Sequence, residues 1–198
     1  MANRIRFRDN RGFSLGPIGF LISANLILWL ATSIRPDLFI RLFGLSLVTF
    51  LSQPWTMLTN MFIHAPFPTL GHILANMLTL FFFGSRLMSM IGEKNFFFVY
   101  FLGGLLGNVL FLLMANPFST AIGASGAVFA VGGALTVLRP KLTVFIFPIP
   151  VPIPLWIAVI GGFVVISFCP GVAWQAHLGG ILVGLTAGYL FRKSPRFY

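Results

Sequence analysis

The chain has 198 residues, of which 58% are hydrophobic and only 8% are charged. Soluble globular domains carry about 25% charged residues, so this composition excludes a water-soluble fold. The formal net charge is +10, but the basic residues stand in short groups between apolar stretches, which argues against a nucleic-acid-binding face. The single cysteine, Cys169, cannot pair within the chain, and no Cys/His spacing is typical of zinc sites. We therefore expect no metal, no cofactor and no nucleic-acid partner.

Apolar stretches recur along the whole length, so we expect residues 1–198 to form a single membrane domain. Each stretch is near the roughly 20 residues that cross about 30 Å of hydrocarbon. Arginines precede the first stretch, as in a signal peptide, but Trp29 and Leu30 stand before Ala31 where cleavage needs small residues. We interpret it as a retained helix and predict an all-α integral membrane protein with six transmembrane helices. The predicted spans are Leu15–Ile34, Leu70–Met90, Phe96–Met114, Ile122–Leu138, Ile153–Phe168 and Trp174–Phe191.

Basic residues fall almost entirely on one side of this predicted bundle. Only Arg35 and Arg41 lie on the other side, and dropping any one helix would scatter the later charges over both. Cytoplasmic loops carry an excess of Lys and Arg, so we expect a cell-membrane protein with both termini in the cytoplasm. The residues on the cytoplasmic side are Arg4, Arg6, Arg8, Arg11, Arg86, Lys94, Arg139, Lys141, Arg192, Lys193 and Arg196.

Two connections between the spans have unusual compositions. The outer connection, Pro36–Thr69, is long and rich in large apolar side chains such as Trp55, which would be costly to leave in water. We expect it to be partly embedded, as helical turns along the bilayer surface. On the inner side, the run PIPVPIP at Pro148–Pro154 lacks four backbone N–H donors. It cannot be regular helix, and we expect it to enter the fifth span at an angle.

Polar residues occur near the outer ends of three predicted spans: His72 and Asn76 on the second, Ser125 on the fourth and His177 on the sixth. A polar side chain in a membrane core costs free energy unless it has a partner or lines a wet cavity, so these are functional candidates. Counting from the inner arginines at roughly 1.5 Å per residue places Ser125, His177 and His72 about 21 to 23 Å from the inner edge. Three independent helices therefore carry polar residues at one depth. The arginine markers are Arg86, Arg139 and Arg192.

Helical periodicity places small residues near the faces that carry Ser125 and His177. Small residues let helices approach closely, so we expect the fourth and sixth helices to pack there. That packing would bring a hydroxyl and an imidazole within hydrogen-bonding reach, as a nucleophile and its base. His72 and Asn76, four residues apart, share a helix face and could donate to one oxyanion. The small residues are Gly132 and Thr136 on the fourth helix and Gly180, Gly184 and Gly188 on the sixth.

Each of these residues also has an ordinary structural explanation. A serine in a transmembrane helix commonly bonds the carbonyl one turn earlier, and glycine stripes commonly serve packing alone. A lone buried histidine is commonly a satisfied polar group. The shared depth, side and residue types favour catalysis over these explanations.

Three motifs stand on the fourth, sixth and second predicted spans: GASG at Gly123–Gly126, AHLGG at Ala176–Gly180 and HILAN at His72–Asn76. Together they resemble the rhomboid family. The α/β-hydrolase elbow GxSxG is not satisfied, because Ala127 occupies its last glycine position. The resemblance covers the whole predicted six-helix core.

The resemblance implies an intramembrane serine endopeptidase with a Ser–His dyad, in which Ser125 is the nucleophile and His177 the general base and then acid. It also implies an oxyanion hole formed by His72, Asn76 and the backbone N–H of Ser125. Its partners would be the lipid bilayer and the transmembrane segments of single-span substrates, cleaved near their outer end through an outward-opening site. The acids Asp9, Asp37 and Glu93 all lie outside the predicted spans, in keeping with a dyad.

Other positions support or depart from this pattern. Gly123 and Gly126 would let the backbone bend and approach closely around the nucleophile. Phe129 would stack on His177, at a position that is often Tyr in the family. The family's Trp-Arg pair and a glutamate after the second helix are absent, since Thr56 follows Trp55 and Met88 stands near the glutamate position. His64 resembles a histidine that braces the first loop, and Cys169–Ala173 is a candidate lid over the site.

Two other functions are compatible with the composition. A rhomboid-like pseudoprotease would bind transmembrane helices without cleaving them, but such relatives typically lack the serine or the histidine. A small transporter is disfavoured because the sequence has no inverted repeat and no intramembrane acid for ion coupling. The sequence leaves the oligomeric state open.

Overall fold

The computed structural model of the chain describes residues 16–145 and 151–193. Several predictions fall outside these residues: Leu15 at the start of the first span, residues 148–150 of the proline-rich run, and five of the flanking charges. Those charges are Arg4, Arg6, Arg8, Arg11 and Arg196.

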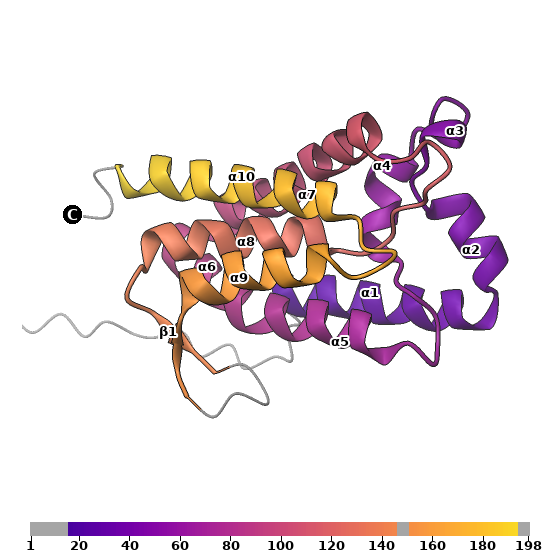
Figure 1. Cartoon of the computed structure of the whole chain (residues 1–198). Coiled ribbons are helices and arrows are strands. Elements are labelled where there is room, and N and C mark those ends of the chain that lie inside the picture. Colours follow the sequence, from indigo (N-terminus) through magenta and orange to yellow (C-terminus); the bar gives the residue numbers. More distant parts are fainter. Residues whose placement is uncertain (1–15, 146–150, 194–198) are drawn as a thin grey trace, which may run out of the picture.

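Helical segments occupy all six predicted spans within the described residues. Three of them, Pro17–Ile34, Leu70–Ile91 and Glu93–Met114, are long and apolar enough to cross a membrane. The second of these is continuous but contains a π-helical turn, η2, at Leu80–Gly84 between α5 and α6. The helices run side by side in one bundle (Figure 1). Their bounds are α1 Pro17–Ile34, α5 Leu70–Thr79, α6 Ser85–Ile91, α7 Glu93–Met114, α8 Ser125–Leu138, α9 Leu155–Ser167 and α10 Trp174–Arg192.

The fourth helix begins later than predicted, at Ser125 instead of Ile122. The residues before it are held by bonds to the first outer connection: Ala121 pairs with Leu45 in an isolated β-bridge, and the Gly123 N–H donates to the Asn60 carbonyl at 2.8 Å. Gly123 has φ +117°, which no right-handed helix contains. Ser125 is therefore the first residue of α8 and does not lie in the interior of the helix.

The inner connection between α8 and α9 contains a short antiparallel ribbon, which the all-α prediction missed. Its strands are β1 Thr143–Val144 and β2 Ile153–Pro154, with Thr143 opposite Pro154. Proline fixes φ and lacks an N–H, so the described end of the proline-rich run is extended and not helical, as predicted. The fifth helix consequently begins at Leu155, two residues later than predicted.

The outer connection between α1 and α5 folds into short helical elements. They gather at the end of the bundle opposite to the C-terminal end of α10 (Figure 1). Hydrogen bonds tie this connection to the bundle: the Trp29 indole donates to the Ala65 carbonyl at 3.0 Å, and the Ser46 hydroxyl donates to the Pro117 carbonyl at 3.0 Å. The elements are α2 Pro36–Phe43, α3 Leu47–Phe50, α4 Thr56–Thr59 and η1 Asn60–Phe62.

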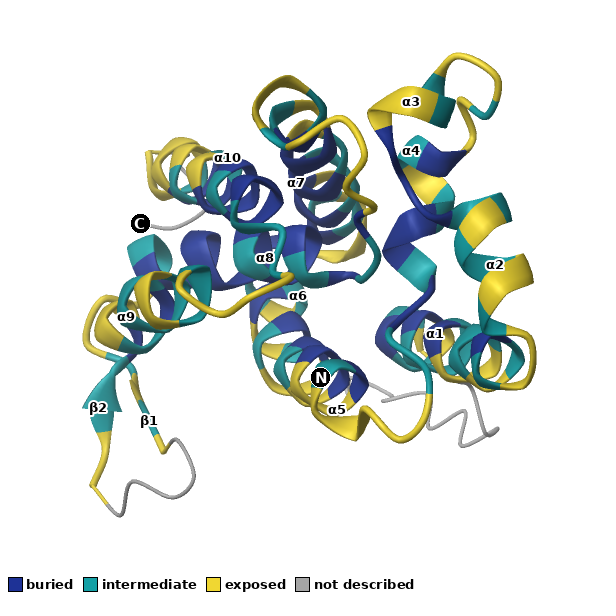
Figure 2. Cartoon of the chain, turned by 45° about the vertical axis from the view of Figure 1, so that its right-hand side comes forward, coloured by how far each residue is buried: buried dark blue, intermediate teal, exposed yellow. Residues whose placement is uncertain are grey.

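Helix α8 forms the centre of the bundle, and most of its residues are buried (Figure 2). Its contact with α10 is made through glycines, as predicted for α10: a Cβ on Gly180 or Gly184 would meet the carbonyl oxygen of Gly126 or Ala130. The predicted α8 face is wrong, however. Gly132 faces α9, since a Cβ there would lie 3.2 Å from a Val159 methyl. Positions spaced by four residues from Gly126 form the close contact instead, because α10 crosses that side of α8.

Candidate active site

Ser125 is the first residue of α8, preceded by Ala124 at the N-cap position. The first N–H groups of a helix have no partner within the helix, so the Ser125 N–H is available to a ligand. The positive end of the helix dipole also lies here, which favours negative charge close to the serine. The position of the serine at the helix N-terminus was not part of the sequence prediction, which had placed it inside the span.

His177 comes from the first turn of α10 and is 5% exposed. Its Nε2 lies 2.7 Å from the Ser125 Oγ, so the structure brings together the two residues that the sequence singled out. The opposite ring nitrogen, Nδ1, is buried and has no hydrogen-bond partner among the described residues. No described carboxylate therefore orients this imidazole, and the geometry is that of a pair and not of a triad.

Phe129 lies one turn after Ser125 on α8 and contacts the imidazole of His177. The two ring centroids are 4.8 Å apart, with an angle of 36° between the planes. Phe129 is itself contacted by Phe163 of α9, whose ring meets it edge to face with the centroids 6.2 Å apart. Aromatic contacts of this kind restrict the orientation of the imidazole without accepting its proton.

His72, on α5, lies against the segment that precedes Ser125. A Cβ on Gly123 would be only 2.6 Å from the His72 Nε2, so the ring occupies the space that a side chain at position 123 would need. The His72 Nδ1 accepts the Ala65 N–H at 3.3 Å, which puts the ring proton on Nε2 when the imidazole is neutral. His72 thus presents an N–H donor beside Gly123.

Asn76 is 5% exposed and lies one turn after His72 on the same helix. Its amide donates to the His72 carbonyl at 2.8 Å. An amide nitrogen carries two N–H groups, so one remains for another acceptor. The structure therefore leaves Asn76 with a donor to offer, although its recorded hydrogen bond lies within its own helix.

His64 is fully buried in the outer connection and supports the backbone at Ala124, just before Ser125. Its Nε2 accepts the Ala124 N–H at 3.4 Å, and its ring lies 4.9 Å from that of His72. Burial, and to a lesser extent the neighbouring His72, lowers the pKa of His64 from 6.5 to about 3. A neutral imidazole is what acceptance of an N–H requires, so His64 can hold Ala124 at all physiological pH values.

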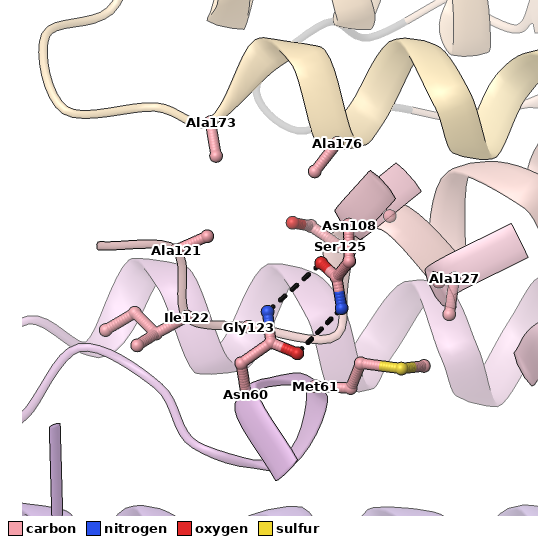
Figure 3. Close-up of a pocket in the computed structure, with 12 residues that line it drawn as sticks. Asn60, Met61, Asn108, Ala121, Ile122, Gly123, Ser125, Ala127, Ala173 and Ala176 are labelled. Atoms are coloured by element: carbon pink, nitrogen blue, oxygen red, sulfur yellow. Dashed lines mark hydrogen bonds between the residues drawn. The ribbon is translucent and has the colours of Figure 1, made fainter. Parts of the chain in front are cut away.

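Sequence reasoning missed a second pair of residues beside the serine, Asn60 and Asn108. Their side-chain amides bond each other reciprocally, at 3.1 Å and 2.8 Å, as Figure 3 shows. Asn108 is an amide in the C-terminal part of the apolar helix α7, so the rule that singled out His72 and Ser125 could have found it. Asn60 lies in the outer connection, where a polar residue gives no comparable signal.

A small pocket opens beside Ser125 (Figure 3) and has room for on the order of one water molecule. It lies between the start of α8, the start of α10, the outer part of α7 and the outer connection. Apart from Ser125 and the two amides, its walls consist of small and apolar residues. They are Met61, Gly104, Ala121, Ile122, Gly123, Gly126, Ala127, Ala173 and Ala176.

The site as a whole combines a hydroxyl hydrogen-bonded to an imidazole with free or partly free N–H donors around it. Such a set can deliver a nucleophile, accept its proton and stabilise an oxyanion. The described residues hold no group of three or more His, Cys, Asp or Glu side chains that could bind a metal ion.

Comparison with known proteins gives a consistent result. Residues 51–194 match the Rhomboid domain family. The chain is 32% identical to RHOMBOID-like protein 1 of Arabidopsis thaliana over 153 residues, which cover 77% of this chain and 38% of the relative. It is also 32% identical to Rhomboid-like protease 3 of Toxoplasma gondii over 146 residues, covering 72% of this chain and 53% of the relative.

A bacterial relative matches over nearly its whole length. The Bacillus subtilis rhomboid protein YdcA is 25% identical over 190 residues, which cover 91% of this chain and 92% of that protein. The chain spans only 38% of the length of the first two eukaryotic relatives, from Arabidopsis thaliana and Saccharomyces cerevisiae. The family match covers well over half of the chain and includes every residue of the site described above. The chain is therefore a membrane protein of the rhomboid family.

Proposed function

We propose that this protein is an intramembrane serine endopeptidase that cleaves transmembrane helices of single-span membrane proteins near their outer end. The observation that carries the proposal is the 2.7 Å distance between the Ser125 Oγ and the His177 Nε2. A serine hydroxyl is a weak nucleophile at neutral pH, and a base at this distance can accept its proton as the hydroxyl attacks. Membership of the rhomboid family, which includes proteases, supports the same conclusion.

In the proposed reaction, the Ser125 Oγ bonds to the carbonyl carbon of the scissile peptide while its proton passes to the His177 Nε2. The tetrahedral intermediate then collapses, and the same nitrogen donates the proton to the leaving amine. The resulting ester at Ser125 is hydrolysed by water, which His177 activates in turn. The hydroxyl is thereby regenerated, and no cofactor is needed.

The oxyanion of the tetrahedral intermediate would be stabilised by three donors. They are the N–H of Ser125 at the start of α8, the Nε2–H of His72 beside Gly123, and the second amide N–H of Asn76. Donors that are already in place when charge develops are worth far more in a water-poor site than in bulk water. The dipole of α8 adds to this stabilisation.

A transmembrane substrate must unwind before its peptide bond can reach Ser125. Residues that weaken a helix, such as Gly and Pro, should therefore favour cleavage when they lie near the cut. Ser125 starts α8 at the end of the bundle where α2, α3 and α4 gather, so the proposed cut lies near one membrane face (Figure 1). The basic residues at the other end of the predicted spans support a site on the outer side and both termini in the cytoplasm.

The alternative is a rhomboid-like pseudoprotease that binds transmembrane helices. Purified wild-type protein incubated in detergent with a generic transmembrane substrate distinguishes the two, with Ser125→Ala as the matched control. Cleavage by the wild type and none by Ser125→Ala supports the protease. Binding of the substrate without cleavage by the wild type would establish the pseudoprotease.

A further inference from the structure

The amide side chains of Asn60 and Asn108 lie in the core of the protein, next to the residues that precede Ser125. They are 2% and 4% exposed, respectively. Burying an amide costs free energy unless its hydrogen bonds are made. Here each amide serves as donor and acceptor for the other, at 3.1 Å and 2.8 Å. The pair joins residues from different parts of the fold, the outer connection and α7.

Asn108 differs from the other helical asparagines in the described part of the chain. Asn25 and Asn76 each donate to the carbonyl one turn earlier in their own helix, and Asn95 donates to the Ile91 carbonyl at the end of the preceding helix, at 2.8 Å in every case. Asn108 instead donates to the outer connection twice, to the Asn60 Oδ1 at 2.8 Å and to the Met57 carbonyl at 2.7 Å. Both N–H groups of its amide therefore fasten the turn at residues 57–60 to α7.

The turn at residues 57–60 also holds the backbone at Gly123, just before Ser125. The backbone carbonyl of Asn60 accepts the Gly123 N–H at 2.8 Å, two residues before Ser125. Gly123 has φ +117°, a conformation open to glycine, so the bond to Asn60 restricts the backbone at a residue that has more freedom than most. A continuous series of hydrogen bonds thus runs from α7 through the turn to the start of α8.

The pair also borders the place where the chemistry would occur. Asn60, Asn108 and Ser125 all line the same small pocket (Figure 3). The neighbouring N–H, that of Ala124, is held by His64 of the same connection at 3.4 Å. The two N–H groups immediately before Ser125 are therefore occupied, and the N–H of Ser125 itself is left for a ligand.

We propose that Asn60 and Asn108 are positioning residues for the nucleophile: their amide pair fixes the turn at residues 57–60, which sets the place of Gly123 and hence of the Ser125 Oγ and N–H. The inference rests on the proposed protease function and adds to it a pair of residues outside the dyad and the oxyanion hole. Neither amide takes part in a bond-making step.

The kinetic consequence is specific. A nucleophile and an oxyanion donor that are displaced by about 1 Å lose transition-state stabilisation, which can cost on the order of 100-fold in rate. Binding of the substrate helix should be little affected, because Asn60 and Asn108 are buried and offer it almost no surface. Loss of the amide pair should therefore lower kcat and leave KM nearly unchanged.

The test is the double variant Asn60→Leu/Asn108→Leu. Leucine has nearly the shape of asparagine, and replacing both partners of a buried hydrogen bond by apolar groups of the same shape can leave stability nearly unchanged. Asn25→Leu is the matched control, because it removes a buried amide of α1 that donates to the Leu21 carbonyl and makes no hydrogen bond to the turn at residues 57–60 in the described structure. For each protein, kcat and KM on a transmembrane substrate, the rate of labelling at Ser125 by a phosphonate, and the thermal unfolding temperature are measured.

We expect the double variant to lose at least about tenfold in kcat and in labelling rate, with KM within about twofold of the wild type. Asn25→Leu should keep the wild-type kcat. A double variant that folds and turns over at the wild-type kcat overturns the inference. If the double variant does not fold, Asn60→Ala decides, because it keeps the Asn60 carbonyl and the Asn108–Met57 bond: a kcat at least about threefold lower supports the inference, and a wild-type kcat overturns it.

The same experiment separates this inference from the proposed function. If the wild type does not cleave, or Ser125→Ala cleaves as well as the wild type, the protease proposal fails and the positioning role fails with it. If the wild type cleaves, Ser125→Ala does not, and the amide variants retain full kcat, only the positioning role fails.

Discussion

A Cβ atom at position 123 would lie 2.6 Å from the Nε2 of His72. Gly123 also has φ +117°, a conformation that costs a residue with a side chain about 1 to 3 kcal/mol. Gly123→Ala should therefore shift His72 and the start of α8 together. We expect the rate of substrate cleavage to fall on the order of 10² to 10³-fold, as for the loss of an oxyanion donor, with a lower unfolding temperature.

The control for this variant is Gly162→Ala in α9. A Cβ there would meet nothing within 4 Å, and alanine is a better helix former than glycine. Its activity should stay at the wild-type level. A Gly123→Ala protein as active as Gly162→Ala would contradict the assignment of His72 and Gly123 to the site.

Ser125 and His177 should behave as one functional unit. Ser125→Ala and His177→Ala should each abolish cleavage, and the double variant should be no slower than either single variant, because each change removes the same proton-transfer step. Steady-state kinetics of the three variants on one substrate checks this. Multiplicative losses in the double variant would show that the two side chains act independently.

Covalent labelling tests the activation of the serine without a substrate. A serine-directed phosphonate or isocoumarin should label the wild type at Ser125 and leave His177→Ala unlabelled, since the hydroxyl without its base is a weak nucleophile. Mass spectrometry of the labelled peptide identifies the residue. Equal labelling of the wild type and His177→Ala would show that the His177 imidazole does not activate Ser125.

The glycine contact between α10 and α8 should determine how closely the dyad is held. A side chain at position 184 would meet the Ala130 carbonyl, so Gly184→Val should force the helices apart. Overpacking of this kind costs about 1 to 3 kcal/mol. We expect a lower unfolding temperature and a lower kcat, whereas Leu182→Val, at an exposed position of the same helix, should change neither. An unchanged kcat in a folded Gly184→Val protein would argue that this contact does not control the site.

The orientation in the membrane can be read from reporter fusions. Fusions after Arg139 and Tyr198 should report a cytoplasmic location, and a fusion after Pro117 should report an external one, because the basic residues gather on one side of the predicted spans. A cytoplasmic signal at Pro117 would contradict the proposed arrangement of six spans.

The positions of the long helices follow from the sequence alone. Membrane-spanning helices need long apolar stretches, and these are visible without any tertiary information. The predicted ends of the second, third and sixth spans lie within three residues of the observed helices Leu70–Ile91, Glu93–Met114 and Trp174–Arg192. The pairing of Ser125 with His177 also followed from local information, because both residues were placed near the same end of their predicted spans and were recognised by residue type and motif.

What only the tertiary structure decided are the features that depend on contacts between distant segments. The sequence predicted that the fourth helix begins at Ile122. Bonds to Leu45 and Asn60 instead hold residues 121–123 outside the helix and place Ser125 at its N-terminus. The amide pair of Asn60 and Asn108 was likewise invisible, because its partners are 48 residues apart and one of them lies in a connection. Periodicity within one helix reports which residues share a face, but not which neighbour covers that face. The side of α8 that meets α10 therefore had to come from the packing of the whole bundle.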